Sequence, residues 1–243
     1  IDSYSTYILK FNRRNVVEYN VIPYGYSNLS ASGMNFAEMT NAVKKELKKA
    51  SLIKSFEEDM VFGCGPSFID ISRIAKKLTR YPIDIDNNYE LTDSAVQKVV
   101  EFAKDLDTQK VKKIKGIGPE GAESINGGLA IISAIYEILK LSSINVTIAN
   151  ALEGVVITNL VGSSNEKYSD LLQNSLDNYY EFKKEGLAIN SQVYDMAILL
   201  FKQLKVVHKL PRMYVKPLKI AAYMFDCGKF INFNNHQKHS FYT

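Results

Sequence analysis

The pattern of hydrophobic residues changes near residue 160, and this change constrains the fold of the chain more than any other feature. Before it, short β-branched runs alternate with segments of helical period, whereas from about residue 167 onward the period is helical throughout. The polar stretch VGSSNEK, residues 161–167, is the best candidate for a linker. The sequence therefore predicts a mixed α/β domain over residues 1–160 and an all-α domain over residues 161–243.

The expected order of elements places one Gly-rich turn between a strand and a helix. Apolar and β-branched runs indicate strands, and apolar stripes at helical spacing indicate helices. Thr92 is a plausible N-cap, and Pro119 suits the first turn of a helix. In chain order we expect two strands within residues 1–25, a helix at 34–50, a strand at 59–65, helices at 67–78, 91–106 and 116–141, a strand at 144–149, and helices at 167–185, 192–206 and 214–229.

Composition and cysteine content argue against several classes of protein. The 243 residues are 46% hydrophobic and 23% charged, as in an ordinary globular protein. The two cysteines, Cys64 and Cys227, form no CxxC pair, which argues against a structural zinc site and a disulfide-built secreted domain. The longest apolar run is interrupted by Glu137 and is too short to span a bilayer. We therefore expect a cytoplasmic protein without a membrane segment, and we expect further sequence before Ile1, which begins within a strand-like run.

Positive charge is concentrated at the C-terminal end. Residues 201–243 contain eight Lys or Arg and a single acidic residue, Asp226, so their net charge is +7, while that of the whole chain is +4. A basic end favours a polyanionic partner such as polyphosphate, a nucleotide, nucleic acid or a membrane surface. A solvated helix face explains the same charges equally well.

Two short loops could hold phosphate. The loop GCGPS, Gly63–Ser67, follows an expected strand and precedes an expected helix, so its glycines and the helix N-terminus could approach a phosphate group. The hydroxyls of SYST, Ser3–Thr6, could donate to phosphate oxygens. Pro66 counts against the first loop because proline has no N–H to donate. A junction of this kind can also be only a turn.

The stretch FDCGKFINFNNHQKHS, residues 225–240, contains two of the three histidines in the chain. Asp226, His236 and His239 could in principle hold a metal, although a hydrolytic metal centre usually needs more carboxylate or histidine ligands. The alternatives are a cationic edge for a polyanion, or the packed end of a helical core with Gly228 as a turn.

The ordered succession of these segments resembles the Ppx/GppA family, the exopolyphosphatases and guanosine pentaphosphate phosphohydrolases. The C-terminal AAYMFDCGKFINFNNHQKHSFYT is similar to the end of the family, which carries a basic His-x-Lys/Arg-His-Ser. IDSYSTYIL stands at the family's phosphate loop, IPYGYSNLS at a Leu-Pro-Leu-Gly-like step, and VFGCGPSFIDISRIAKKLTRYPI at its second glycine loop. YELTDSAVQKVVEF, GIGPEGAESINGGLAII and VTIANALEGVV follow in order.

The resemblance covers essentially the whole chain and implies a fold. Residues 1–160 would be the family's second actin-like (ribonuclease-H-like) domain, and residues 161–243 its HD-like helical domain, so the fold class is α/β plus all-α. The resemblance also implies Mg²⁺ as the cofactor of an active enzyme, and a homodimer as a possible assembly.

The resemblance is weakest in the first phosphate loop. Residues 2–4 occupy three positions that are Gly in the family, and Tyr7 replaces a Glu, whereas Ser5 and Thr6 agree. A tyrosine at position 4 would obstruct the close approach of backbone to phosphate that glycine permits.

Other family positions are changed as well. Pro66 and Ser67 stand where the second loop has Gly-Thr, Gly121 stands at an Arg position, and Phe225 stands where a metal-binding His would be. The Glu that activates water in the family belongs to a first domain that this sequence does not contain. The resemblance therefore assigns no catalytic residue and no metal ligand within the chain.

Two functions of different classes remain. The first is a phosphatase that hydrolyses a terminal phosphoanhydride in polyphosphate or in a guanosine penta- or tetraphosphate with the help of Mg²⁺. The second is a catalytically inactive module that binds polyphosphate or nucleic acid. The candidate phosphate-binding residues are Ser5, Thr6, Gly63, Gly65 and Ser67, and the candidate polyanion-binding residues are Lys229, His236, Lys238 and His239.

Overall fold

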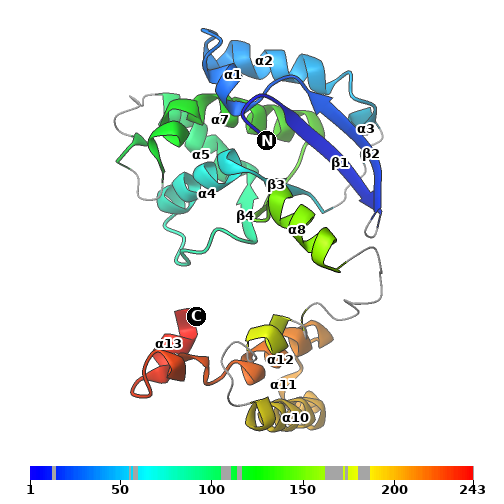
Figure 1. Ribbon diagram of the computed structural model, residues 1–243, viewed down its shortest axis with the longest axis vertical. Coiled ribbons are helices and arrows are strands. Elements are labelled where there is room, and N and C mark those ends of the chain that lie inside the picture. The colour runs from blue at the N-terminus through cyan, green and yellow to red at the C-terminus, as the bar shows by residue number, and fades with distance from the viewer. Residues whose placement is uncertain are drawn as a thin grey trace. The chain divides into compact units, whose positions relative to one another are not determined.

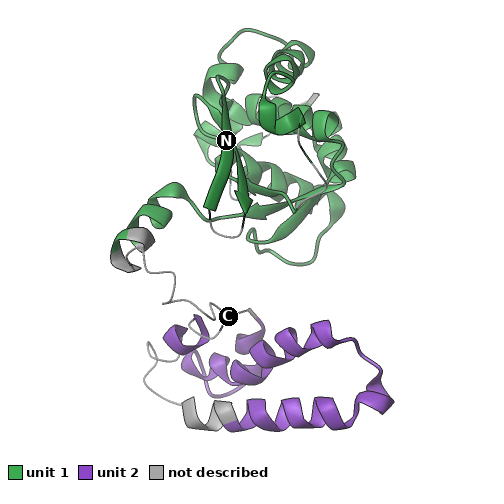
Figure 2. Cartoon of the chain, turned by 90° about the vertical axis from the view of Figure 1, so that its right-hand side faces the viewer, with its two compact units in different colours: residues 1–160 green, residues 161–243 purple. Residues whose placement is uncertain are grey.

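The chain forms two compact units, Ile1–Leu160 and Val161–Thr243, which Figure 2 shows in separate colours. They are seen in a computed structural model. The residues that the structure describes are 1–12, 15–54, 56, 60–104, 111–113, 117–161, 172, 175–179 and 187–242. Apart from Val161, the expected linker lies outside these residues, as does most of the helix expected at residues 167–185.

Unit 1 contains two small sheets. Strands β1 (Thr6–Asn12) and β2 (Asn15–Ile22) form an antiparallel hairpin, and both were expected within residues 1–25. The second sheet has the order β3-β5-β4, in which β5 (Ser143–Thr147) pairs parallel with β3 (Phe62–Cys64) and antiparallel with β4 (Tyr89–Thr92). Strand β4 was not expected. It is only four residues long, and the helix expected at residues 91–106 overlaps its second half.

Unit 1 also contains seven helices with described bounds (Figure 1). They are α1 (Tyr26–Ser30), α2 (Phe36–Leu47), α3 (Ser51–Lys54), α4 (Pro66–Thr79), α5 (Asp93–Lys104), α7 (Pro119–Leu139) and α8 (Ala151–Val161). The sequence predicted α2, α4, α5 and α7 near these positions, since each carries an apolar stripe.

Helix α7 is the central element of unit 1. It contacts α1, α2, α4 and α5, and its Leu129, Ile131 and Ile132 are completely buried. Each such side chain stabilises the fold by roughly 1.5–3 kcal/mol relative to exposure. The helix begins as predicted, with Gly118 in an extended conformation and Pro119 in the first turn, where the missing N–H costs no hydrogen bond.

Strand β4 is fixed by tertiary contacts. Leu91 is fully buried, and its carbonyl oxygen accepts a hydrogen bond from the hydroxyl of Tyr136 on α7. Thr92 then starts α5, because its Oγ1 accepts the N–H of Ala95 at 3.3 Å. The predicted N-cap role of Thr92 is therefore confirmed.

An ion-pair cluster holds the segment before β4 against α4. The buried Lys76 Nζ lies 2.6 Å from Asp86 Oδ1, and Arg73 donates to Asp86 Oδ2 at 2.7 Å. Burial would raise the pKa of Asp86, but the hydrogen bonds and charges of Lys76 and Arg73 outweigh it and hold that pKa below its ordinary value.

The hairpin joins the rest of unit 1 at its base. Thr6 on β1 pairs with Ile22 on β2. These two residues are the buried positions of the two strands. Large apolar side chains along the hairpin, such as Phe11 and Tyr19, are exposed.

Unit 2 is helical in its described part. Its elements are α10 (Leu187–Gln203), α11 (Lys205–His208), η1 (Arg212–Tyr214), α12 (Val215–Tyr223), η2 (Cys227–Phe230) and α13 (His236–Tyr242). Helix α10 packs against α12, and α13 packs against η2. The helix expected at residues 214–229 is shorter than predicted: it ends at Tyr223, and a 3₁₀ helix follows at Cys227.

No helix within the described ranges is long and apolar enough to cross a membrane.

Candidate functional site

Ile1, just before the first of the two loops expected to hold phosphate, contacts Cys64 and Gly65 in the second loop. The backbone nitrogen of Ile1 donates to the carbonyl oxygen of Cys64 at 3.0 Å. Gly65 has φ +109°, and a Cβ at this position would collide with the carbonyl oxygen of Ile1. Only glycine combines this backbone conformation with this approach. The segment Ile1–Ser5 therefore lies beside the start of α4.

The first loop is tied to the N-terminus of α1. The N–H groups of Tyr26 and Ser27 donate to the carbonyl oxygens of Asp2 and Ser3, each at 3.0 Å. Gly25 makes room for this contact, since a Cβ there would collide with the carbonyl oxygen of Asp2. The chain itself thus satisfies the first amides of α1, which would otherwise attract an anion.

Two candidate phosphate-binding residues have structural partners. Thr6 is 2% exposed, and its hydroxyl donates to the carbonyl oxygen of Tyr24 at 2.7 Å. Gly63 faces the ring of Phe68, whose nearest carbon would lie 2.5 Å from a Cβ on the glycine. Ser5 is half-buried, and its carbonyl oxygen accepts the N–H of Asp2 at 2.9 Å.

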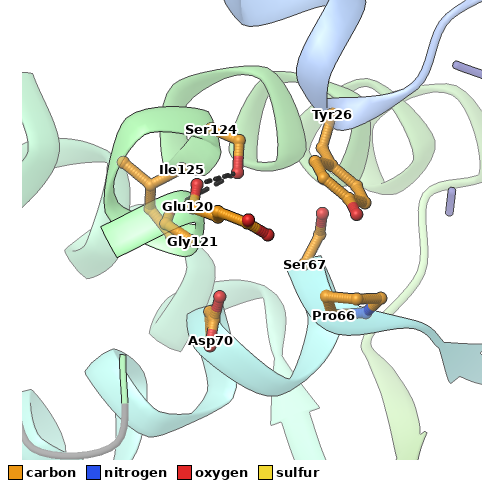
Figure 3. Close-up of a pocket in the computed structure, with 8 residues that line it drawn as sticks. All are labelled: Tyr26, Pro66, Ser67, Asp70, Glu120, Gly121, Ser124 and Ile125. Atoms are coloured by element: carbon orange, nitrogen blue, oxygen red, sulfur yellow. Dashed lines mark hydrogen bonds between the residues drawn. The ribbon is translucent and has the colours of Figure 1, made fainter. Parts of the chain in front are cut away.

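Ser67 lines a pocket between the first turns of α4 and α7 (Figure 3). Its walls combine apolar surface with hydroxyl and carboxyl groups. The lining residues are Tyr26, Pro66, Ser67, Asp70, Glu120, Gly121, Ser124 and Ile125. Its cavity volume is about 110 Å³, so it accepts a small group rather than a whole nucleotide.

The hydroxyl of Ser67 points into this pocket (Figure 3). The residue is only 6% exposed. Helix α7 passes close behind it, since a Cβ on Gly128 would lie 2.6 Å from Ser67 Oγ. Within the described ranges the hydroxyl makes no hydrogen bond. The oxygen opens into the pocket, where a ligand or water can bond to it.

Asp70 reaches the same pocket from one turn further along α4. Burial raises its pKa from 3.8 to about 6, the nearby Arg73 opposes this shift, and the negative charge of Asp86 adds to it. Arg73 Nη1 lies 3.9 Å from Asp70 Oδ1, which is a weak pairing. The negative charge of ionised Asp70 is therefore only partly compensated by Arg73.

Glu120 completes the polar side of the pocket from the first turn of α7. Its side chain extends toward Ser67 and Tyr26 (Figure 3). The hydroxyl of Tyr26 is held in place by Ser3 Oγ at 2.9 Å.

Among the polar residues of this pocket, Tyr26, Asp70, Glu120 and Ser124 were not predicted from the sequence. A signal was present for two of them: Asp70 follows Ser67 by three residues on one helix face, and Glu120 directly follows the proline that starts α7. Nothing in the sequence joins these two helix starts, since the contact between α4 and α7 is tertiary.

The candidate polyanion-binding residues of unit 2 lie near one another in sequence but differ in surroundings. Lys229 Nζ lies 3.3 Å from Asp226 Oδ2 and 5.7 Å from the ring centroid of Phe225. Lys238 is exposed, His239 is half-buried, and the Nδ1 atom of His236 is buried without a hydrogen bond to any described group.

The retained basic motif also has a packing role. Helix α13 lies directly against Gly228, where a Cβ would collide with the carbonyl oxygen of His236. Ser240 Oγ accepts the N–H of Gly228 at 2.8 Å. The interpretation of Gly228 as a turn and packing position agrees with these contacts.

No cluster of three or more His, Cys, Asp or Glu that could hold a metal occurs in the part of the chain that the structure describes.

Comparison with known proteins connects this geometry to one family. Residues 30–162 match the model of the Ppx/GppA phosphatase family. Proteins named guanosine-5'-triphosphate,3'-diphosphate pyrophosphatase from Aeromonas hydrophila subsp. hydrophila and Aeromonas salmonicida are each 30% identical over 132 residues, which are 54% of this chain and 26% of theirs. The chain thus spans about a quarter of the length of these curated relatives.

Solved structures share the fold. The Ppx/GppA family member from Aquifex aeolicus superposes with a TM-score of 0.56 at 20% identity, covering 66% of this chain and 54% of that one. An exopolyphosphatase from Cytophaga hutchinsonii gives a TM-score of 0.60 at 16% identity, covering 68% and 56%. Since the family match also includes more than half of the sequence, this chain belongs to the Ppx/GppA phosphatase family.

Proposed function

We propose that the protein acts on a terminal phosphoanhydride, in inorganic polyphosphate or in a guanosine penta- or tetraphosphate. Unit 1 would hold the phosphates where the loop Ile1–Ser5 meets Gly63–Ser67. The observation that carries this proposal is the contact of these two loops at Gly65, at the start of a 14-residue helix. The names of the relatives, a guanosine-5'-triphosphate,3'-diphosphate pyrophosphatase and an exopolyphosphatase, support the substrate class.

Helix α4 supplies part of the attraction for phosphate. The N-terminus of a helix carries roughly half a positive charge, and its first N–H groups lack partners within the helix. Pro66 removes one of those donors. The hydroxyl of Ser67 is a donor that remains available in the first turn.

A second candidate function is binding without hydrolysis. Two observations favour it: the amides of α1 bond to the chain itself, and the hydroxyl proton of Thr6 is donated to Tyr24. The basic end of unit 2, with Lys229, Lys238 and the two histidines, would then provide a further contact for polyphosphate or nucleic acid.

The finer assignments belong to the same proposal. Unit 1 would correspond to the family's second actin-like domain and unit 2 to its HD-like helical domain. A cytoplasmic location and a homodimer are likewise expected of a family member that acts on cytoplasmic phosphoanhydrides.

The two functions are separated by measuring binding and turnover together. The purified chain is mixed with polyphosphate or guanosine pentaphosphate in the presence of Mg²⁺, and both bound ligand and released phosphate are measured. Phosphate release supports the phosphatase, and binding without release supports the second function. The absence of both would contradict the proposed substrate class.

Ser67→Ala tests the location of the site. We expect a roughly three- to tenfold loss of affinity, the usual effect of removing one hydrogen bond. Ser133→Ala is the matched control, because Ser133 is also a buried helical serine without a described partner but lies outside the loop Gly63–Ser67. Equal effects of the two substitutions would place the phosphates elsewhere.

A further inference from the structure

We propose that the pocket between the first turns of α4 and α7 binds the primary ammonium group of a small alkyl amine, such as a diamine. The site is formed by the carboxylates of Asp70 and Glu120 and the hydroxyl of Ser67. The proposal shares Ser67 with the proposed phosphate site, so the two ligands would compete for its hydroxyl, whereas Asp70 and Glu120 belong to the amine site alone.

The charge of the pocket favours a cation. Asp70 and Glu120 carry two negative charges, and the two helix N-termini contribute roughly half a positive charge each. The carboxylates therefore outweigh the helix ends. No lysine or arginine is among the lining residues. Burial penalises the negative charge of Asp70, and Arg73, whose Nη1 lies 3.9 Å away, offsets this penalty in part. A cation bound in the pocket would compensate that charge.

The hydroxyl of Ser67 independently indicates a ligand. It belongs to a residue that is only 6% exposed, it points into the pocket, and no described group bonds to it. A hydroxyl that opens into a pocket without a described protein partner is available to a ligand. Because a serine oxygen has acceptor lone pairs, it can serve as the third acceptor beside the two carboxylates.

The shape and lining favour an alkylammonium over a metal ion. An ammonium group has three N–H donors, and the carboxylates of Asp70 and Glu120 and the hydroxyl of Ser67 offer acceptors along the pocket wall. The remaining wall is apolar, with Tyr26, Pro66 and Ile125, and it suits the methylene chain behind the nitrogen. A hard divalent cation prefers six or more oxygen ligands or retained waters, and apolar walls provide neither.

The test uses the whole chain and amines of known structure. Binding of 1,4-diaminobutane and n-butylamine is measured by isothermal titration calorimetry at pH 7.5 and low salt, with tetramethylammonium and MgCl₂ as comparison ligands. We expect saturable binding of both primary amines. Tetramethylammonium, which has the charge but no N–H donor, should bind at least about tenfold more weakly. Equal binding of tetramethylammonium or of Mg²⁺ would overturn the proposal, as would the absence of amine binding.

Substitutions locate the bound nitrogen. Asp70→Asn and Glu120→Gln should each weaken amine binding by about tenfold or more, since each removes a charge-assisted hydrogen bond. Glu123→Gln is the matched control: it removes one carboxylate from the same part of α7, and Glu123 pairs with Lys112 outside the pocket. Unchanged affinity in both pocket variants, or an equal loss in the control, would contradict the site.

Folding does not confound this test. Glu120 is exposed at the start of α7, so Glu120→Gln leaves the core intact even if Asp70→Asn does not fold. Thermal melts of each variant without ligand give the fold control. Phosphate binding, measured separately, can fail while amine binding persists, which distinguishes this proposal from the phosphate site.

Discussion

Gly121 lies against Asp70 so closely that a Cβ at position 121 would collide with Asp70 Oδ2. The contact joins the first turn of α7 to the first turns of α4 and closes one side of the pocket. The Ppx/GppA pattern that the sequence resembles has an Arg at this position. In this chain the carboxylate of Asp70 occupies the space next to residue 121.

Gly121→Ala should alter the pocket more than the fold. The new methyl group must displace the Asp70 carboxylate, which can move because the end of a side chain can rotate. In the opposite direction, alanine improves helix propensity over glycine by about 1 kcal/mol. We expect the free energy of unfolding to fall by less than about 1 kcal/mol or to rise, while amine affinity falls. Chemical denaturation and calorimetry measure the two effects. A large loss of stability would show that Asp70 cannot move.

Asp70 should make stability depend on pH in the weakly acidic range. Its pKa is raised to about 6 in the folded state, so the folded chain binds more protons than the unfolded chain between about pH 4 and pH 6. This group therefore favours the folded state at low pH, and its contribution declines as pH rises through 6. Arg73 opposes the shift, and Asp86 adds to it.

Asp70→Asn isolates this effect. The variant should melt at a higher temperature than the unmodified chain at pH 7.5, and the difference should shrink at pH 5, where Asp70 is largely protonated. Glu101→Gln, an exposed change on α5, is the control and should show no such trend. A pH-independent difference for Asp70→Asn would contradict the raised pKa.

Gly65→Ala should destabilise unit 1 by more than a simple backbone effect. Gly65 has φ +109°, and a Cβ there would also collide with the carbonyl oxygen of Ile1. Gly33 has φ +74°, but no atom lies within 4 Å of the place where its Cβ would be. Gly33→Ala therefore measures the cost of the backbone conformation alone, about 1 kcal/mol. We expect Gly65→Ala to cost at least about 1 kcal/mol more in urea denaturation, because the methyl group also separates the two loops. Equal costs would mean that the two loops do not touch.

Asp86→Asn should be strongly destabilising because it leaves the buried Lys76 without its carboxylate partner. Breaking such a pair costs about 3 kcal/mol or more. Glu46→Gln is the control, since it breaks the exposed Lys49–Glu46 pair and should cost less than about 1 kcal/mol. The pKa of Asp86 is lowered, so its contribution is present at neutral pH and is lost as pH falls through that pKa. Measuring the free energy of unfolding of both variants at decreasing pH checks the direction of this pH dependence.

Polyphosphate binding by unit 2 should depend more on Lys238 than on Lys229. Lys229 is already paired with Asp226, whereas Lys238 is exposed on α13. Lys238→Gln should therefore weaken binding more than Lys229→Gln, and added salt should reduce the difference. Filter-binding or calorimetric titration at two salt concentrations measures this, and binding that survives both changes together with His239→Gln would exclude this surface.

The sequence by itself determined helices α2, α4, α5 and α7 and the strand–turn–helix junction of unit 1. Helix α7 could be predicted because a long apolar segment follows Gly118 and Pro119, and α4 because its stripe begins directly after Gly65. These features depend on side-chain periodicity and local backbone chemistry, which a single sequence contains. Strand β4 could not be predicted, because its stability comes from the burial of Leu91 and its contact with Tyr136.

Only the tertiary structure decided which candidate residues form a site. Thr6 and Gly63 fit a local phosphate-loop pattern, yet the fold directs them to Tyr24 and Phe68. Asp70 and Glu120 were not predicted, yet packing of α4 on α7 places them in one pocket with Ser67. The physical reason is that a site depends on which surfaces pack together, and contacts between distant segments are set by burial of the shared core rather than by neighbouring residues.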